Sequence, residues 1–120
     1  MAQDFPISIA RVYDPSETRM GACLLVDRLW PRGISKADLP IDDWPKDATP
    51  SNELRKWLHA DPSRWPDFRT RYEQELEQNP EAVERCLAWC RKGPVTLLTA
   101  ARDREHNHVI VLRDWLLAHR

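Results

Sequence analysis

Residues 22–26, Ala-Cys-Leu-Leu-Val, form an apolar run that ends abruptly in charge. A strand with apolar side chains on both faces is typical of the buried, mostly parallel sheets of α/β proteins. Residues 27–33, Asp-Arg-Leu-Trp-Pro-Arg-Gly, follow at once and bring two guanidiniums, a carboxylate and an indole. Ligands of open α/β sheets bind at the carboxyl ends of strands. This junction therefore predicts both a layered α/β fold and a site at the end of the strand.

Two further segments have the pattern of strands. Residues 7–12 alternate apolar and polar side chains before a Tyr-Asp-Pro turn, and residues 95–99, Val-Thr-Leu-Leu-Thr, have the composition of a central strand. A long helical region separates residues 22–26 from residues 95–99, which allows these two strands to be parallel neighbours.

Three helices are predicted by a capping residue followed by proline, a pair that favours helix starts. The pairs lie at residues 49–50, 61–62 and 79–80. A fourth helix follows the polar loop at residues 102–106, and its inward side chains include Val109, Leu112 and Leu116. The expected fold is a small single-domain layered α/β fold spanning residues 1–120, with a short, mostly parallel sheet packed by about four helices.

The stretch from Pro31 to Pro50 contains four prolines and scattered charge, so we expect an irregular excursion. Its apolar side chains would attach it to the body of the domain; these are Ile34, Leu39, Ile41 and Trp44. Long excursions of this kind in compact domains are often functional.

Composition narrows the function classes. The formal net charge of −1 disfavours generic nucleic-acid binding, which usually needs a strongly basic domain. The three cysteines cannot all pair within one chain, and the first residues lack the pattern of a signal peptide, so we expect a cytoplasmic protein. No stretch approaches the ~20 apolar residues of a membrane-spanning helix.

Asp27, Arg28 and Arg32 are the first candidate site residues. A guanidinium matches the geometry of phosphate and carboxylate groups, so the two arginines suggest an anion site in which Asp27 orients one of them. An equally good interpretation is that Asp27 and Arg28 pair with neighbouring loops and brace the excursion. Gly33 would allow a sharp turn or a close backbone approach to a ligand.

The loop before the last helix is the natural counterpart. If residues 22–26 and 95–99 are parallel neighbours, Arg28 and Arg32 would face a second group of polar residues across a cleft, with His106 at the same rim. This group is Arg102, Asp103, Asn107 and His108. Asn107 could cap the last helix, and His108 could transfer a proton near neutral pH. A solvated polar loop with a capping asparagine explains the same residues equally well. Arg55 is a further candidate that could reach the cleft.

Other chemistry lacks support in the sequence. No phosphate-binding P-loop, nucleotide-binding glycine motif, nucleophile elbow or zinc-protease motif is present. Cys23 lies inside an apolar strand, a poor place for a reactive thiolate. Cys86 and Cys90 share one helix face without a third ligand, which favours core packing over a metal site. The residues indicate no particular cofactor.

Several segments together resemble a bacterial family known as domain of unknown function 488, in its YeaO-like branch. The most specific is residues 26–33, Val-Asp-Arg-Leu-Trp-Pro-Arg-Gly. Others are residues 11–14, 35–36, 50–51, 54–57, 61–62, 71–72, 95–98, 107–108 and 111–112, together with Trp44 and Lys46. The resemblance implies a compact cytoplasmic α/β domain whose signature residues lie in the strand-end loops, which favours the cleft.

Two positions depart from the family pattern. Relatives commonly carry tyrosine where this chain has Thr99, and lysine where it has Arg102. If that tyrosine stacks on a ligand or moves a proton, the activity of this chain would be altered. The positive charge at Arg102 is kept, so attraction of an anion should be retained.

The leading hypothesis is a cleft for a small phosphate- or carboxylate-bearing ligand. Arg28, Arg32, Arg55 and Arg102 would bind charge, Asn107 would position it, and His108 with Asp27 would be the acid/base pair of a possible hydrolase or transferase. The alternative is a non-enzymatic module that binds a protein or a nucleic-acid backbone through a Trp/Arg face. Exposure of the rings discriminates between them: buried indoles under a concave cleft favour the small ligand. The rings in question are Trp30, Trp44 and Trp57.

Overall fold

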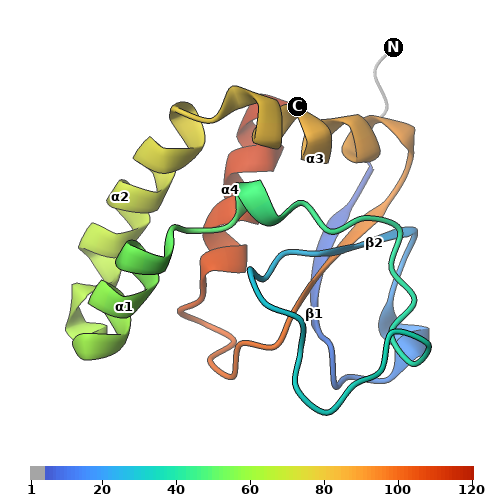
Figure 1. The fold of residues 1–120 in the computed structure, drawn as a ribbon. Helices are drawn as coiled ribbons and strands as arrows, with labels where there is room; N and C mark the ends of the chain where they lie inside the picture. Colours follow the sequence, from blue (N-terminus) through green and yellow to red (C-terminus); the bar gives the residue numbers. More distant parts are fainter. Residues whose placement is uncertain (1–4) are drawn as a thin grey trace.

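The central strand of the sheet is the last one in the chain. The computed structural model describes residues 5–120, and within them the strands β1 (Ile7–Arg11), β2 (Ala22–Leu25) and β3 (Val95–Thr99) pair in the order β1-β3-β2 (Figure 1). Both pairings are parallel. Every residue of β3 is buried, as its apolar composition requires of a strand with neighbours on both sides. The prediction of a central third strand parallel to the second is confirmed.

The register brings the carboxyl ends of the strands together. Arg11 pairs with Thr99, and the Val26 N–H donates to the Leu98 carbonyl just beyond the end of β2. Asp27 and Ala100 therefore leave the sheet side by side. This is the geometric basis for a common rim.

The helices cover one face of the sheet and an irregular segment covers the other (Figure 1). The helices are α1 (Asn52–Ala60), α2 (Trp65–Glu77), α3 (Pro80–Lys92) and α4 (His108–His119). Their buried side chains join those of Leu24, Val26 and Leu97 in one core cluster, which also contains Cys86 and Cys90. The small α/β fold and its four helices are as expected.

The second face is closed by the excursion between β2 and α1. Leu39 packs there against Leu25 and Leu98, with Trp30 and Trp44 at the edges of the same cluster. Prolines at positions 31, 40, 45 and 50 deny this segment a regular helix, and it contains only one 3₁₀ turn, η2 (Lys46–Ala48). The expected tethering of the excursion is confirmed.

The first predicted helix cap is wrong by two residues. Ser51, not Thr49, caps α1: its Oγ accepts from the Leu54 N–H at 3.2 Å, while the Thr49 hydroxyl donates to the Lys46 carbonyl at 2.6 Å. Asp61 caps a short 3₁₀ turn, η3 (Pro62–Arg64), that leads into α2. Asn79 precedes α3 without a side-chain cap, and its Nδ2 donates to the Asp47 carbonyl at 2.9 Å. Another 3₁₀ turn, η1 (Ser16–Thr18), lies between β1 and β2.

Within residues 5–120, no helix has both the length and the apolar composition needed to cross a bilayer. The longest helices, α2 and α3, have 13 residues each.

Gly21 should be the least replaceable glycine. Its φ is +65°, and a Cβ there would lie 1.9 Å from the Pro94 carbonyl oxygen, which belongs to backbone. We expect Gly21→Ala to lower the free energy of unfolding by more than about 1 kcal/mol in urea denaturation, since both the dihedral and the clash oppose it. Gly93→Ala is the matched control, because that backbone is extended and no atom lies within 4 Å. Equal effects of the two substitutions would contradict this account.

Candidate functional site

A cavity of about 760 Å³ opens at the carboxyl ends of the three strands. Its walls come from the end of β1, the segments that follow β2 and precede α1, the helices α1 and α2, and the loop between β3 and α4 with the first residue of α4. Five arginines, two aspartates and three histidines line it, beside apolar side chains. The volume lies in the range of pockets that bind small molecules.

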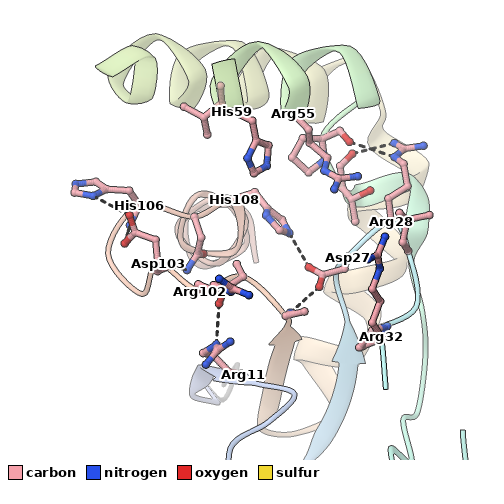
Figure 2. A pocket seen from close by; sticks show the side chains of 18 of the residues that line it. Arg11, Asp27, Arg28, Arg32, Arg55, His59, Arg102, Asp103, His106 and His108 are labelled. Carbon is pink, nitrogen blue, oxygen red and sulfur yellow. Dashed lines mark hydrogen bonds and ion pairs between the residues drawn. The ribbon is translucent and has the colours of Figure 1, made fainter. Parts of the chain in front are cut away.

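All of the candidate residues line this one cavity (Figure 2). They are Asp27, Arg28, Arg32, Arg55, Arg102, Asn107 and His108. The structure thus brings Arg32 and His108 to a common pocket although they lie far apart in the sequence. The functional roles assigned to these residues stay predictions, and their contacts differ in ways that matter for those roles.

The carboxylate of Asp27 is the most connected group in the cavity. Its Oδ1 accepts from the Thr99 hydroxyl at 2.6 Å and lies 3.1 Å from His108 Nε2, and its Oδ2 accepts from the Ala100 N–H at 2.7 Å. Burial by itself would raise the pKa of Asp27, but the hydrogen bonds and the attraction of His108 outweigh it and hold the pKa below its usual value. The carboxylate is therefore ionised at neutral pH and held by donors on three sides.

His108 is the first residue of α4, and its ring points back to the end of β2. Its Nε2 lies 2.7 Å from the Val26 carbonyl oxygen as well as 3.1 Å from Asp27. Both neighbours are acceptors, so Nε2 carries a proton and donates to them. The other ring nitrogen, Nδ1, is the one left to exchange a proton or a hydrogen bond with a ligand.

Arg28 braces the excursion, as one of the two sequence interpretations holds. Its Nε donates to the Pro50 carbonyl at 3.2 Å and one Nη donates to the Thr49 carbonyl at 3.3 Å. Neither acceptor is charged, so the guanidinium keeps its positive charge uncompensated while lining the cavity. Bracing and anion attraction are compatible in this residue.

Asn107 is engaged as the N-cap of α4. Its Oδ1 accepts from the N–H groups of Val109 and Ile110, and its Nδ2 donates to the Asp103 carbonyl at 2.7 Å. The amide is buried, with 6 % of the residue exposed. The helix N–H groups that could have met an anion are thus occupied by this side chain, which supports the capping interpretation.

Arg32, Arg55 and Arg102 are the uncommitted cations of the cavity. Within residues 5–120, no hydrogen bond or ion pair engages any of their three guanidiniums. Arg55 is half-buried on α1, whereas Arg32 and Arg102 are exposed at the rim. A guanidinium that the protein itself leaves unpaired is available to an anionic ligand.

Sequence reasoning missed three lining residues. Arg11 ends β1, and its Nε donates to the Ala101 carbonyl at 2.9 Å. Its place at the end of a predicted strand was the sequence feature that could have identified it, because parallel strands end at the same edge of the sheet. Tyr13 follows it, beside the Arg11 guanidinium. His59 lies four residues after Arg55 on α1, a spacing that places both on one helix face. His106 lines the rim as proposed.

Thr99, which departs from the family pattern, faces Asp27. Its hydroxyl donates to that carboxylate and accepts from the Ala101 N–H at 3.1 Å, and the residue is 1 % exposed. This hydroxyl therefore links the Asp27 carboxylate to the backbone after β3. No cysteine lines the cavity, and burial raises the pKa of the Cys86 thiol to about 12.

The tryptophans near the cavity are partly buried rather than displayed on a flat face. Trp30 donates to the Ile34 carbonyl and Trp44 to the Asp27 carbonyl, both at 2.7 Å. Trp57 lies under the guanidiniums of Arg64 and Arg71. All three indoles thus have partners within the domain.

Replacing Asp27 with asparagine should alter the pH dependence of stability. The folded pKa of Asp27 is lowered, so its contribution is complete above the unfolded pKa of about 3.9 and is lost as pH falls through the folded pKa. In Asp27→Asn, the amide NH₂ would face groups that are themselves donors, such as the Ala100 N–H, so a hydrogen bond would be lost. We therefore expect the free energy of unfolding to fall by about 2 kcal/mol at pH 7. The difference from wild type should narrow below about pH 4. A constant difference across pH, measured by urea denaturation, would contradict this.

The histidine tautomers give a spectroscopic check. Neutral His108 should carry its proton on Nε2, because that atom faces two acceptors. His119 is the internal control with the opposite tautomer, since its Nδ1 lies 2.7 Å from the Trp115 carbonyl oxygen and must donate to it. Long-range ¹H–¹⁵N correlation spectra at high pH distinguish the two forms. A protonated Nδ1 on neutral His108 would refute this arrangement.

Comparison with known proteins gives the family. Residues 6–120 match a family model described as "Inactive DUF488-N3 subclade". The chain is 47% identical over 110 residues to "Uncharacterized protein YeaO" of Escherichia coli K12, covering 92% of this chain and 96% of that protein. It is 37% identical over 116 residues to "Uncharacterized protein Rv3073c" of Mycobacterium tuberculosis H37Rv, covering 97% and 98%. No solved structure matches the chain. The chain therefore belongs to the domain of unknown function 488 family, in its YeaO-like branch.

Proposed function

We propose that this protein binds a small phosphate- or carboxylate-bearing ligand in the cavity at the strand ends. The observation that carries the proposal is the convergence of the guanidiniums of Arg32, Arg55 and Arg102, each without a partner within residues 5–120, on one concave site. A guanidinium fork that the protein leaves unpaired can bind phosphate or carboxylate through charge-assisted hydrogen bonds. The cavity contains two aspartates, and Asp27 is already held by internal donors.

The site favours binding over turnover. The Thr99 hydroxyl is buried and hydrogen-bonded, so it lacks the exposure that a nucleophile needs. The family model carries the description "Inactive", which supports the same choice for this chain. His108 then serves as a hydrogen-bonding group at the ligand, and Asp27 as the residue that positions its ring. Hydrolysis or group transfer would require an activated nucleophile from outside these side chains.

A small ligand fits the site better than a macromolecular partner. The indoles that would form a flat recognition face are partly buried and hydrogen-bonded within the domain, and the arginines line a concave cavity. Leu29 and Tyr13 are exposed at 69% and 53% and line the same cavity, so the apolar surface lies where a ligand would contact it.

Replacing Arg55 should weaken anion binding specifically. A hydrogen bond to a charged group contributes about 1.5–3 kcal/mol, so we expect Arg55→Ala to raise the Kd for inorganic phosphate roughly tenfold at low ionic strength. Chemical-shift titrations with phosphate and with citrate measure this. Arg91→Ala is the matched control, because it removes the same charge from a helix surface where Arg91 pairs with Glu84. Equal weakening by both variants, or no binding of either anion by wild type, would refute the proposal.

A further inference from the structure

The cavity has two chemically different ends. Figure 2 shows Arg28 and Arg32 together at one end and His106 with Asp103 at the other, with His108 and Arg55 between them. Groups that are well separated in one view are at least that far apart in space, so the two ends are distinct. A ligand that fills the cavity must therefore present different chemistry to each end.

The first end is suited to a phosphoryl group. The Arg28 guanidinium donates only to carbonyl oxygens, so no opposite charge pairs with it, and the Arg32 guanidinium has no partner within the described residues. The nearest carboxylate, Asp27, is held by Thr99, Ala100 and His108. The excess of positive charge is matched by a group with two negative charges, which favours phosphate over a single carboxylate.

The second end is suited to a flat ring. His106 lies at this end (Figure 2), and Leu58, His59 and Phe68 also line the cavity; Phe68 is buried, with 1 % of the residue exposed. The His106 ring packs edge-on against Trp65 with centroids 5.4 Å apart, and Trp65 stacks on Phe68 at 5.5 Å. The imidazole is thus supported from behind by a packed aromatic pair. Planar heterocycles bind to such surfaces by stacking.

Helix α1 places a guanidinium and an imidazole side by side between the two ends (Figure 2). Arg55, Leu58 and His59 stand at positions i, i+3 and i+4, so they project from one face of the helix. Arg55 and His59 are separated by about one turn, or roughly 6 Å along the axis. A ligand lying along this face can contact the guanidinium with its phosphoryl group and the imidazole with its ring.

Asp103 fixes the orientation of such a ligand. The N–H groups of Glu105 and His106 donate to its carboxylate and hold the pKa of Asp103 below its usual value, so it is ionised at neutral pH. A negative charge here repels a phosphoryl group and accepts hydrogen bonds from hydroxyl or amino groups. The phosphoryl group is thereby directed to the arginine end.

We infer that the ligand is of the nucleoside phosphate class, with its phosphoryl group at Arg28, Arg32 and Arg55 and its base beside His59 and His106. The inference rests on the proposed function and adds that the bound anion carries a planar base. A cavity of about 760 Å³ is far larger than an isolated phosphate needs and is typical of sites for ligands of this size.

Four probes test the inference by isothermal titration calorimetry: adenosine 5′-monophosphate, ribose 5-phosphate, inorganic phosphate and adenosine. We expect adenosine 5′-monophosphate to bind at least tenfold more tightly than ribose 5-phosphate, because the base adds a stacking contact. His59→Ala should weaken binding of adenosine 5′-monophosphate about fivefold and leave the affinity for inorganic phosphate unchanged. His119→Ala, an exposed histidine outside the cavity, should change neither affinity.

The outcomes separate this inference from the proposed function. Equal affinity for adenosine 5′-monophosphate and ribose 5-phosphate would overturn the nucleoside class while leaving anion binding intact. An unchanged affinity of His59→Ala for adenosine 5′-monophosphate would overturn the placement of the base. Failure of all three phosphorylated probes to bind, or adenosine binding as tightly as its monophosphate, would overturn both proposals.

Discussion

The organisation of the strand-end rim depends on one largely buried carboxylate, with 15% of its side chain exposed. Asp27 accepts hydrogen bonds from the Thr99 hydroxyl, the Ala100 N–H and the His108 ring, so it joins the end of β2, the end of β3 and the start of α4. A buried charge without such partners would cost several kcal/mol. The three segments must therefore remain together for the charge to be tolerated, and their alignment creates the cavity between them.

The same hydrogen bonds decide which side chains remain for a ligand. His108 Nε2 and the amide of Asn107 are used to hold the loop and α4, while Arg28 holds the residues that precede α1. Arg32, Arg55 and Arg102 take no part in this network within the described residues. Hydrogen-bonded and unpaired side chains thus alternate among neighbouring residues, and the unpaired cations, which we propose bind a ligand, line a cavity whose walls are already held in place.

The irregular excursion has two roles that stem from its prolines. Unable to form a helix, it runs along the second face of the sheet and closes the smaller core cluster with Leu39, Trp30 and Trp44. The Trp44 indole donates to the Asp27 carbonyl, and this bond ties the excursion to the rim. Gly33, at a φ of +77° with open space around its Cα, turns the chain just after Arg32. The segment that completes the core therefore also presents Arg32 at the cavity.

Local pattern alone determined the class of fold and predicted residues that line the cavity at the strand ends. Two apolar runs, residues 22–26 and 95–99, predicted parallel strands, and the charged residues after each run predicted a polar rim. Such predictions are possible because side-chain periodicity and the composition of strand ends are properties of short segments. Which residues far apart in the chain come into contact was determined only by the tertiary structure. Ser51 became the cap of α1 because the Thr49 hydroxyl closes η2, and Arg11 and His59 joined the cavity because β1 and α1 pack beside β3 and α4. Arg28 donates to the carbonyls of Thr49 and Pro50, and His108 lies beside the Val26 carbonyl and Asp27. No local pattern encodes these partners, since a hydrogen bond between distant residues exists only once the chain has folded.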